Sequence, residues 1–165
     1  MKNTFHVVCA LALWLMFAVV PAKAEEPGAA AEKAAVENTF RDYVATFIAF
    51  VESGDSKKIP AFFAEPVLFP SIGQVAATPA DVEKWAESIR PALQKKGYAR
   101  FEPQQLSVKL QGKNVALLSY SADRKTKDGT FIEKSANTVL LKKTDAGWKI
   151  IAFVFHPPED TIKFD

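Results

Sequence analysis

The chain has 165 residues, with 21 Lys and Arg, 19 Asp and Glu, 2 His and 1 Cys. Lys2 and Lys23 lie in an N-terminal segment that we expect to be removed, which lowers the basic count to 19 and the formal net charge from +2 to 0. A neutral chain offers no basic surface to a phosphate backbone, so we do not expect nucleic acid as the main partner. Cys9 lies in the same segment, and His156 is the single histidine after it. The remaining chain therefore has no disulfide and no Cys/His metal cluster, and we expect no metal and no other cofactor.

Residues 1–24 have the pattern of a signal peptide. Lys2 precedes an apolar run at 7–20, and small residues at Ala22 and Ala24 fit a signal-peptidase site. A membrane anchor is the alternative, but this run of fourteen residues is shorter than the roughly 20 that span a bilayer. We expect cleavage after Ala24, no membrane contact afterwards, and a periplasmic or secreted location in a bacterium.

The segment after the signal peptide predicts a short leader and then a helix. Residues 25–35 are mainly Ala, Glu and Gly around Pro27, and we expect a flexible leader there, followed by a single domain at 36–165. Apolar residues then recur at the helical period of 3.6 until Gly54, which predicts an amphipathic core helix. This stripe consists of Val36, Phe40, Tyr43, Val44, Phe47, Ile48 and Val51.

Three shorter elements follow. Residues 55–64 predict a short helix or turn around Pro60, and residues 66–70 predict a strand with a proline at each end, which suits a sheet edge. Thr78 can cap a further helix, since Pro79 and Asp81 follow it at favourable positions. We expect this helix to run towards Gly97 and to kink or break near Pro91.

From Tyr98 onwards the apolar period changes from 3.6 to 2, which predicts four long antiparallel strands. Asp128-Gly129 is a strong hairpin signal between the second and third of them. The last strand, at 148–156, is apolar on both faces, unlike a strand with one wet face. It is either a fully covered central strand, or one face lines a cavity while Ile151, Phe153 and Phe155 pack on a second subunit. We favour the second alternative.

This order of elements resembles the nuclear transport factor 2-like superfamily, and within it the bacterial SnoaL-like and related exported domains. The resemblance rests on the helix at 36–51 with Gly54-Asp55 after it, the hairpin at 127–130, the closing segment 147–150, and His156 at the strand end. It implies an α+β, cystatin-like fold, in which a cone-shaped antiparallel sheet wraps around about three N-terminal helices. It also implies a homodimer through the sheet. The function stays open, because this scaffold is shared by isomerases, dehydratases, cyclases and binding proteins.

The candidate site residues are those that can line the inside of such a cone. His156 is the one mature side chain that titrates near neutrality, and with Tyr43 it is a weak candidate for acid/base catalysis. Asn137 either points inward, where it needs a partner, or lies on the wet face. Asp42 lies opposite the apolar stripe and is discarded. We expect a ligand to contact Tyr43, Phe47, Trp85, Tyr120, Asn137, Trp148 and His156.

These residues favour an exported domain that binds a small apolar molecule. The first alternative is an acid/base enzyme such as an isomerase, dehydratase or hydrolase of a small organic substrate. The second is a protein-interaction module of the cell envelope. No phosphate-binding loop, dinucleotide-binding turn, nucleophile elbow or zinc-protease helix is present in the sequence.

Overall fold

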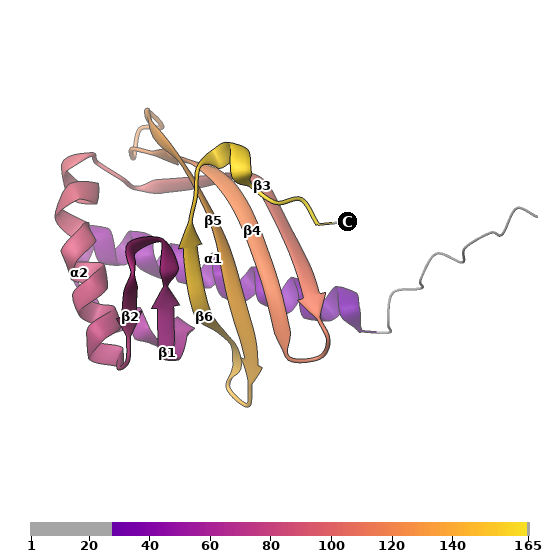
Figure 1. Ribbon diagram of the computed structural model, residues 1–165. Helices are drawn as coiled ribbons and strands as arrows, with labels where there is room; N and C mark the ends of the chain where they lie inside the picture. Colours follow the sequence, from indigo (N-terminus) through magenta and orange to yellow (C-terminus); the bar gives the residue numbers. More distant parts are fainter. Residues whose placement is uncertain (1–27, 165) are drawn as a thin grey trace, which may run out of the picture.

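The structure of the protein is a computed structural model that describes residues 28–164. Over those residues it has two α-helices and one six-stranded sheet with the strand order β2-β1-β6-β5-β4-β3. Figure 1 shows the strands side by side, with α1 behind the sheet and α2 beside β2. The predicted α+β fold is confirmed. The elements are α1 (Ala29–Ser53), β1 (Phe63–Phe69), β2 (Gln74–Ala76), α2 (Pro79–Lys95), β3 (Arg100–Gln111), β4 (Val115–Lys125), β5 (Phe131–Thr144) and β6 (Gly147–Phe155).

The first helix starts earlier than predicted. Residues 29–35, expected in a flexible leader, form the first two turns of α1. They are held to the sheet through Glu32, which accepts hydrogen bonds from Lys143 at 2.6 Å and from the Trp148 indole at 3.2 Å. The predicted signal peptide, 1–24, and the first residues of the leader lie outside the described residues. Within the described range, no helix is long and apolar enough to cross a membrane.

The segment between the two helices differs from the prediction in two ways. The expected second helix is a single 3₁₀ turn at Pro60–Phe62, so two α-helices rather than three pack on the sheet. The predicted edge strand, β1, lies between β2 and β6, because β2 pairs along its outer side. The helix α2 begins with the predicted Thr78 cap and continues through Pro91 without breaking.

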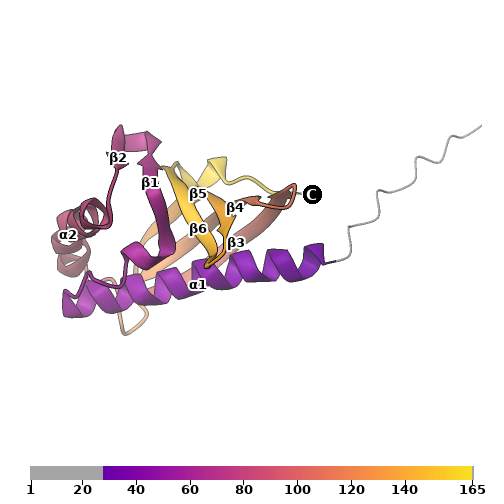
Figure 2. The ribbon, with the colours of Figure 1, turned by 90° about the horizontal axis from the view of Figure 1, so that it is seen from below.

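The four long strands form the curved part of the sheet, and α1 crosses one face of it (Figure 2). We call this the inner face. Aromatic rings join the two layers: Phe40 lies 4.7 Å from Tyr120 and 6.1 Å from Phe101, measured between ring centroids. Phe40 is 1% exposed, and burying a side chain of this size is worth about 1.5–3 kcal/mol. These contacts fix α1 against the sheet.

A bulge in β6 corrects the predicted faces of the last strand. Leu141 pairs with Ile150, but its neighbour Leu140 pairs with Ala152, so Ile151 is an extra residue and the alternation changes there. Phe153 consequently points to the inner face, where it is 3% exposed and its ring lies 5.9 Å from that of Tyr43. Phe155 pairs with Asn137 and shares this inner face, so the prediction that Phe153 and Phe155 pack on a second subunit is wrong.

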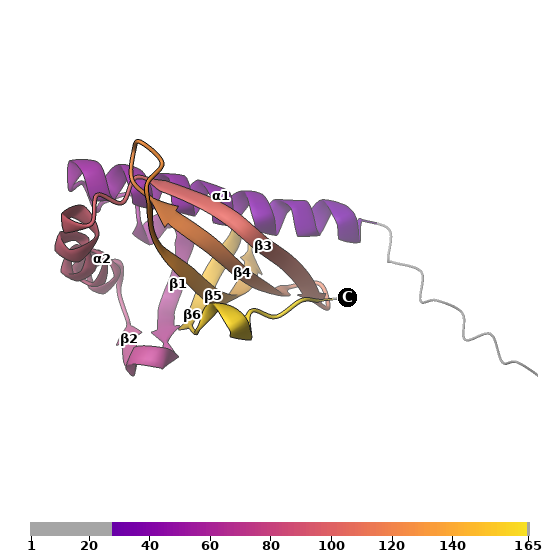
Figure 3. The same ribbon diagram turned by 90° about the horizontal axis from the view of Figure 1, so that it is seen from above.

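The outer face of the sheet is partly covered by the C-terminal segment, which lies opposite α1 (Figure 3). The backbone N–H of Ile162 donates to Ser119 on β4, and Ser107 on β3 donates to the Ile162 carbonyl. At the other edge of the sheet, Leu68 of β1 and its pairing partner Val75 of β2 are 44% and 61% exposed. A homodimer through the sheet stays a prediction, and its apolar contact surface would have to be on this outer face.

Candidate functional site

A small cavity lies between the two helices and the inner face of the sheet. Its volume is about 40 Å³. A space of that size holds little more than ordered water, whose smallest sites need about 10–15 Å³. The cavity is lined by Tyr43, Val44 and Phe47 of α1, Trp85 and Ile89 of α2, and Tyr98, Phe101, Tyr120, Arg124, Asn137, Phe153 and Phe155 of the sheet and the segment before it.

The walls of the cavity are mainly aromatic. Trp85 stands on α2, where its ring stacks on Phe69 of β1 with centroids 4.5 Å apart. Phe47 of α1 packs beside it, at 6.4 Å between centroids. Such pairs are worth about 0.5–1.5 kcal/mol beyond the burial of their area, so they give the cavity a firm apolar wall.

Asn137 is the polar group at the centre of this site. Its side chain is 2% exposed, and its amide nitrogen donates to the hydroxyl of Tyr120 on the neighbouring strand. Its amide oxygen is buried and has no hydrogen-bond partner among the described residues. Leaving such an acceptor unpaired costs about 1–3 kcal/mol. The cavity therefore contains an acceptor that needs a donor from a ligand or a water molecule.

Arg124 also lines the cavity, four residues along β4 from Tyr120, the pairing partner of Asn137, and it shares its carboxylate with Lys96. It donates from Nη1 to Glu133 at 3.0 Å, and Glu133 also accepts from Lys96 at 2.5 Å. The Arg124 guanidinium lies over the ring of Tyr98, 5.4 Å from its centroid. Arg124 Nε is buried without a partner within the described part of the chain. A second unpaired polar group therefore lies at the cavity.

The ionisable groups of the site keep fixed charges at neutral pH. Burial raises the pKa of Tyr98 to about 12 and the pKa values of Tyr43 and Tyr120 well above their usual range, although Arg124 opposes each shift. Partial burial raises the pKa of Glu133, but the hydrogen bonds from Lys96 and Arg124 outweigh it and hold that pKa below its usual value. The three tyrosines are therefore hydrogen-bond donors, and Glu133 is a carboxylate.

The structure brings together five of the seven predicted ligand-binding residues. Tyr43, Phe47, Trp85, Tyr120 and Asn137 all line the cavity, and Asn137 takes the inward of its two predicted orientations. Asp42 is exposed, as expected.

The other two predicted ligand-binding residues, Trp148 and His156, do not line the cavity. The Trp148 indole donates to Glu32, eleven residues before Tyr43 on α1, which is about 16 Å along the helix. His156 lies on the outer face, since its Nε2 accepts from Thr138 at 3.1 Å and its Nδ1 donates to the Pro157 carbonyl at 2.9 Å. The bulge at Ile151 explains this placement, because it reverses the face of every later residue in β6.

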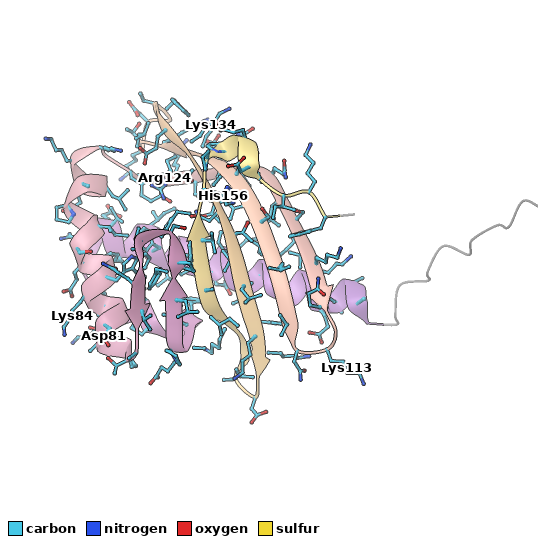
Figure 4. All side chains as sticks on the ribbon, in the orientation of Figure 1. Asp81, Lys84, Lys113, Arg124, Lys134 and His156 are labelled. Carbon is cyan, nitrogen blue, oxygen red and sulfur yellow. The ribbon has the colours of Figure 1, made fainter. Side chains whose placement is uncertain are left out.

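Sequence reasoning missed Arg124 and Phe101 as lining residues. The alternation of β4 puts Arg124 on the face of Tyr120, and that signal was visible. Phe101 lies at the start of β3 (Arg100–Gln111). The alternating residues that predicted this strand begin only at Leu106. Figure 4 shows Arg124 at the same end of the sheet as Lys134 and His156, far from Lys113 at the opposite turn.

Other depressions border the domain, and two of them bear on the choice of site. A groove of about 270 Å³ lies between α1 and β3, and it shares Val44 and Phe101 with the cavity wall. An open depression of about 580 Å³ lies at the start of α1, near Lys113 and Lys143. It contains none of the buried unpaired groups, so the smaller inner cavity is the better candidate site. Residues 28–164 contain no group of acidic, His or Cys side chains suited to a metal ion.

Solved structures of similar fold come from several bacteria. An NTF2-like protein with a cystatin-like fold from Novosphingobium aromaticivorans is 20% identical, with a TM-score of 0.54 over 81% of this chain and 90% of that one. The protein Aln2 from a Streptomyces species is 16% identical, with a TM-score of 0.55 over 75% and 91%. A protein of unknown function with a cystatin-like fold from Nostoc punctiforme is 12% identical, with a TM-score of 0.54 over 72% and 88%. At these identities the likeness shows the fold alone.

The sequence itself gives the family. Comparison with curated proteins finds no match. The sequence profile of one family, described as NTF2-like protein (DUF6841), matches residues 31–158, from the first turn of α1 to the segment just after β6. That match covers more than half of the chain, so the protein belongs to this NTF2-like family.

Proposed function

We propose that this domain binds a small, mainly apolar molecule in the cavity between α1, α2 and the sheet. The observation that carries the proposal is Asn137, whose amide oxygen is buried without a partner in residues 28–164, in a side chain that lines a mainly aromatic cavity. Ligand sites are mostly apolar, with a few polar groups that fix the ligand's orientation. A group that costs folding energy and contacts an apolar cavity fits that role.

The cavity must enlarge to hold a ligand. Sites for organic molecules have volumes of roughly 300 Å³ or more, well above the 40 Å³ present. The groove between α1 and β3 lies behind Val44 and Phe101, and its volume added to the cavity reaches that lower limit. Rotation of Phe101, which is half-buried, would join the two spaces. We propose this groove as the entrance.

Binding is a better account than acid/base turnover. Acid/base catalysis needs a group whose pKa lies near the working pH. The titratable residues that line the cavity are Arg124 and three tyrosines with raised pKa values. His156, the candidate base, is on the outer face. Export through the predicted signal peptide stays part of the proposal, with the ligand met in the periplasm or outside the cell.

Native mass spectrometry of the wild type and Asn137→Leu, both purified gently from an exporting bacterial host, tests this proposal. We expect a discrete extra mass on the wild type and none on the variant. The variant removes an acceptor whose burial costs about 1–3 kcal/mol but also loses the hydrogen bond to Tyr120, so its stability should be close to that of the wild type. An empty wild type, or a variant that keeps the same extra mass, would count against the proposal.

A further inference from the structure

The charges around the cavity do not balance. Arg124 and Lys96 share the single carboxylate of Glu133, which leaves one positive charge in excess. The Lys96 side chain is 48% exposed, whereas that of Arg124 is 24% exposed and its Nε is buried. In the described part of the chain no second carboxylate contacts Arg124. Arg124 is the less exposed of the two cations and shares its carboxylate, so a further anionic partner would stabilise Arg124 more than Lys96.

Hydrogen-bond donors also outnumber acceptors in the cavity. Among the described residues, Arg124 Nε–H has no partner, and the hydroxyls of Tyr43 and Tyr98, which burial keeps protonated by raising their pKa values, belong to residues that line the same cavity. Tyr120 accepts from Asn137, so its own proton is free to be donated. All four of these groups can donate, and among the described residues the buried cavity acceptor without a partner is the Asn137 amide oxygen. A site of this kind suits a ligand that carries a negatively charged oxygen.

The remaining walls suit a planar ring. Phe47, Trp85, Phe153 and Phe155 surround the rest of the cavity, and aromatic faces and edges pack well against another aromatic ring. The small space limits the ring system, even after Phe101 has moved to join the groove. The ligand is therefore compact as well as anionic.

We propose that the ligand is a small aromatic carboxylate, whose ring packs between the aromatic walls and whose carboxylate accepts hydrogen bonds from Arg124 and the tyrosine hydroxyls. This inference rests on the proposed function, since it names the ligand class of the same cavity. A hydroxyl or amine on the ring would donate to Asn137. Neutral rings of the same size lack the partner that Arg124 requires and bind more weakly.

Isothermal titration of the purified protein at neutral pH with benzoate and with benzyl alcohol tests the inference. The two probes have the same ring and nearly the same size, but only benzoate is charged. We expect the wild type to bind benzoate at least about tenfold more tightly. Arg124→Gln should remove this difference by weakening benzoate about tenfold and leaving benzyl alcohol unchanged. Arg124→Lys keeps the positive charge but not the planar set of donors, so its affinity for benzoate should lie between those of the wild type and Arg124→Gln.

Lys134→Gln is the matched control. It removes a positive charge from the neighbouring strand, but Lys134 is exposed and on the outer face, opposite its neighbour Glu133. This variant should bind benzoate as the wild type does. An equal loss in Lys134→Gln and Arg124→Gln would overturn the inference in favour of general charge attraction. Equal affinity of the wild type for both probes would overturn the inference and leave the proposed function standing, whereas binding of neither at millimolar concentration would overturn both.

Discussion

At the scale of single residues, the site is defined by groups that the fold leaves unpaired. Burying Asn137 and Arg124 would cost less free energy if all their polar atoms had hydrogen-bond partners. Unsatisfied buried polar groups are rare in native proteins, and a ligand site is one explanation for them. The hydroxyl of Tyr120 links the two strands that carry them. The protonation of the tyrosine hydroxyls decides whether the cavity offers these hydrogen-bond donors, and it can be measured as a function of pH.

Tyr98 gives a pH test of this environment. Its side chain is 7% exposed, and burial raises its pKa to about 12, against about 10 in the unfolded chain. The folded state holds the proton more tightly, so the stabilisation is complete below pH 10 and is lost as the pH rises from about 10 through about 12. Between pH 9 and pH 11 the wild type should lose about 1 kcal/mol more unfolding free energy than Tyr98→Phe. Urea unfolding at both pH values measures this, and equal losses would show that Tyr98 is not buried as described.

Much of the site at residue scale was predictable from local pattern. The helical stripe placed Tyr43 and Phe47 together, and alternation grouped Tyr120 with Arg124 along β4, while Asn137 of β5 stayed open between the inner and the wet face. Of the two predicted residues that lie outside the cavity, Trp148 and His156, His156 follows a bulge in β6. The position of a bulge depends on how two strands pair, and the sequence of one strand does not contain that information.

At the scale of elements, the two helices are fixed to each other at the end of α1. Arg90 of α2 donates from Nε to the Val51 carbonyl at 3.1 Å and from Nη2 to the Glu52 carbonyl at 3.3 Å. These carbonyls have no helical partner of their own, so Arg90 caps α1 and positions α2, which carries Trp85. Gly54 lies against the Arg90 guanidinium and ends the helix.

Substitution of Gly54 tests this junction, with Gly112 as the control. Both glycines have a positive φ, +85° and +67°, but a Cβ at Gly54 would lie 3.0 Å from Arg90 Cζ, and one at Gly112 meets nothing within 4 Å. Gly112→Ala should lose about 1 kcal/mol for the left-handed backbone. Gly54→Ala should lose about 1 kcal/mol more, because it displaces the Arg90 hydrogen bonds. Chemical denaturation compares them, and similar losses would mean that Arg90 does not hold the junction.

Two predictions about elements were wrong, the flexible leader at 29–35 and the edge position of β1. Residues 29–35 are rich in alanine, the best helix former, and they continue α1 backwards. Their few apolar contacts suggested a leader, but Glu32 ties them to Lys143 and Trp148, which are more than a hundred residues away in the chain. The prolines around β1 suggested an edge, whereas β2 covers that side of the strand. Both errors come from long-range pairing that local sequence does not encode.

At the scale of the whole molecule, the sheet separates two surfaces with different roles. The inner face holds the aromatic cavity under α1 and α2. The outer face holds His156 and the C-terminal segment, which is bound to serine side chains of β3 and β4. The family scaffold fixes this arrangement but not the chemistry, so the side chains of the cavity decide what the domain can bind.

The most direct test of ligand binding in this cavity is a ¹⁵N NMR titration with phenol, benzoate and benzyl alcohol. Trp85 lines the cavity, while the Trp148 indole is bonded to Glu32 at the far end of α1, so the two indole N–H signals report on different places. We predict that at least one of these molecules shifts the Trp85 indole and Asn137 amide signals saturably and leaves the Trp148 indole in place. Shifts at Trp148 without Trp85, or no shift with any of the three, would contradict binding at this site.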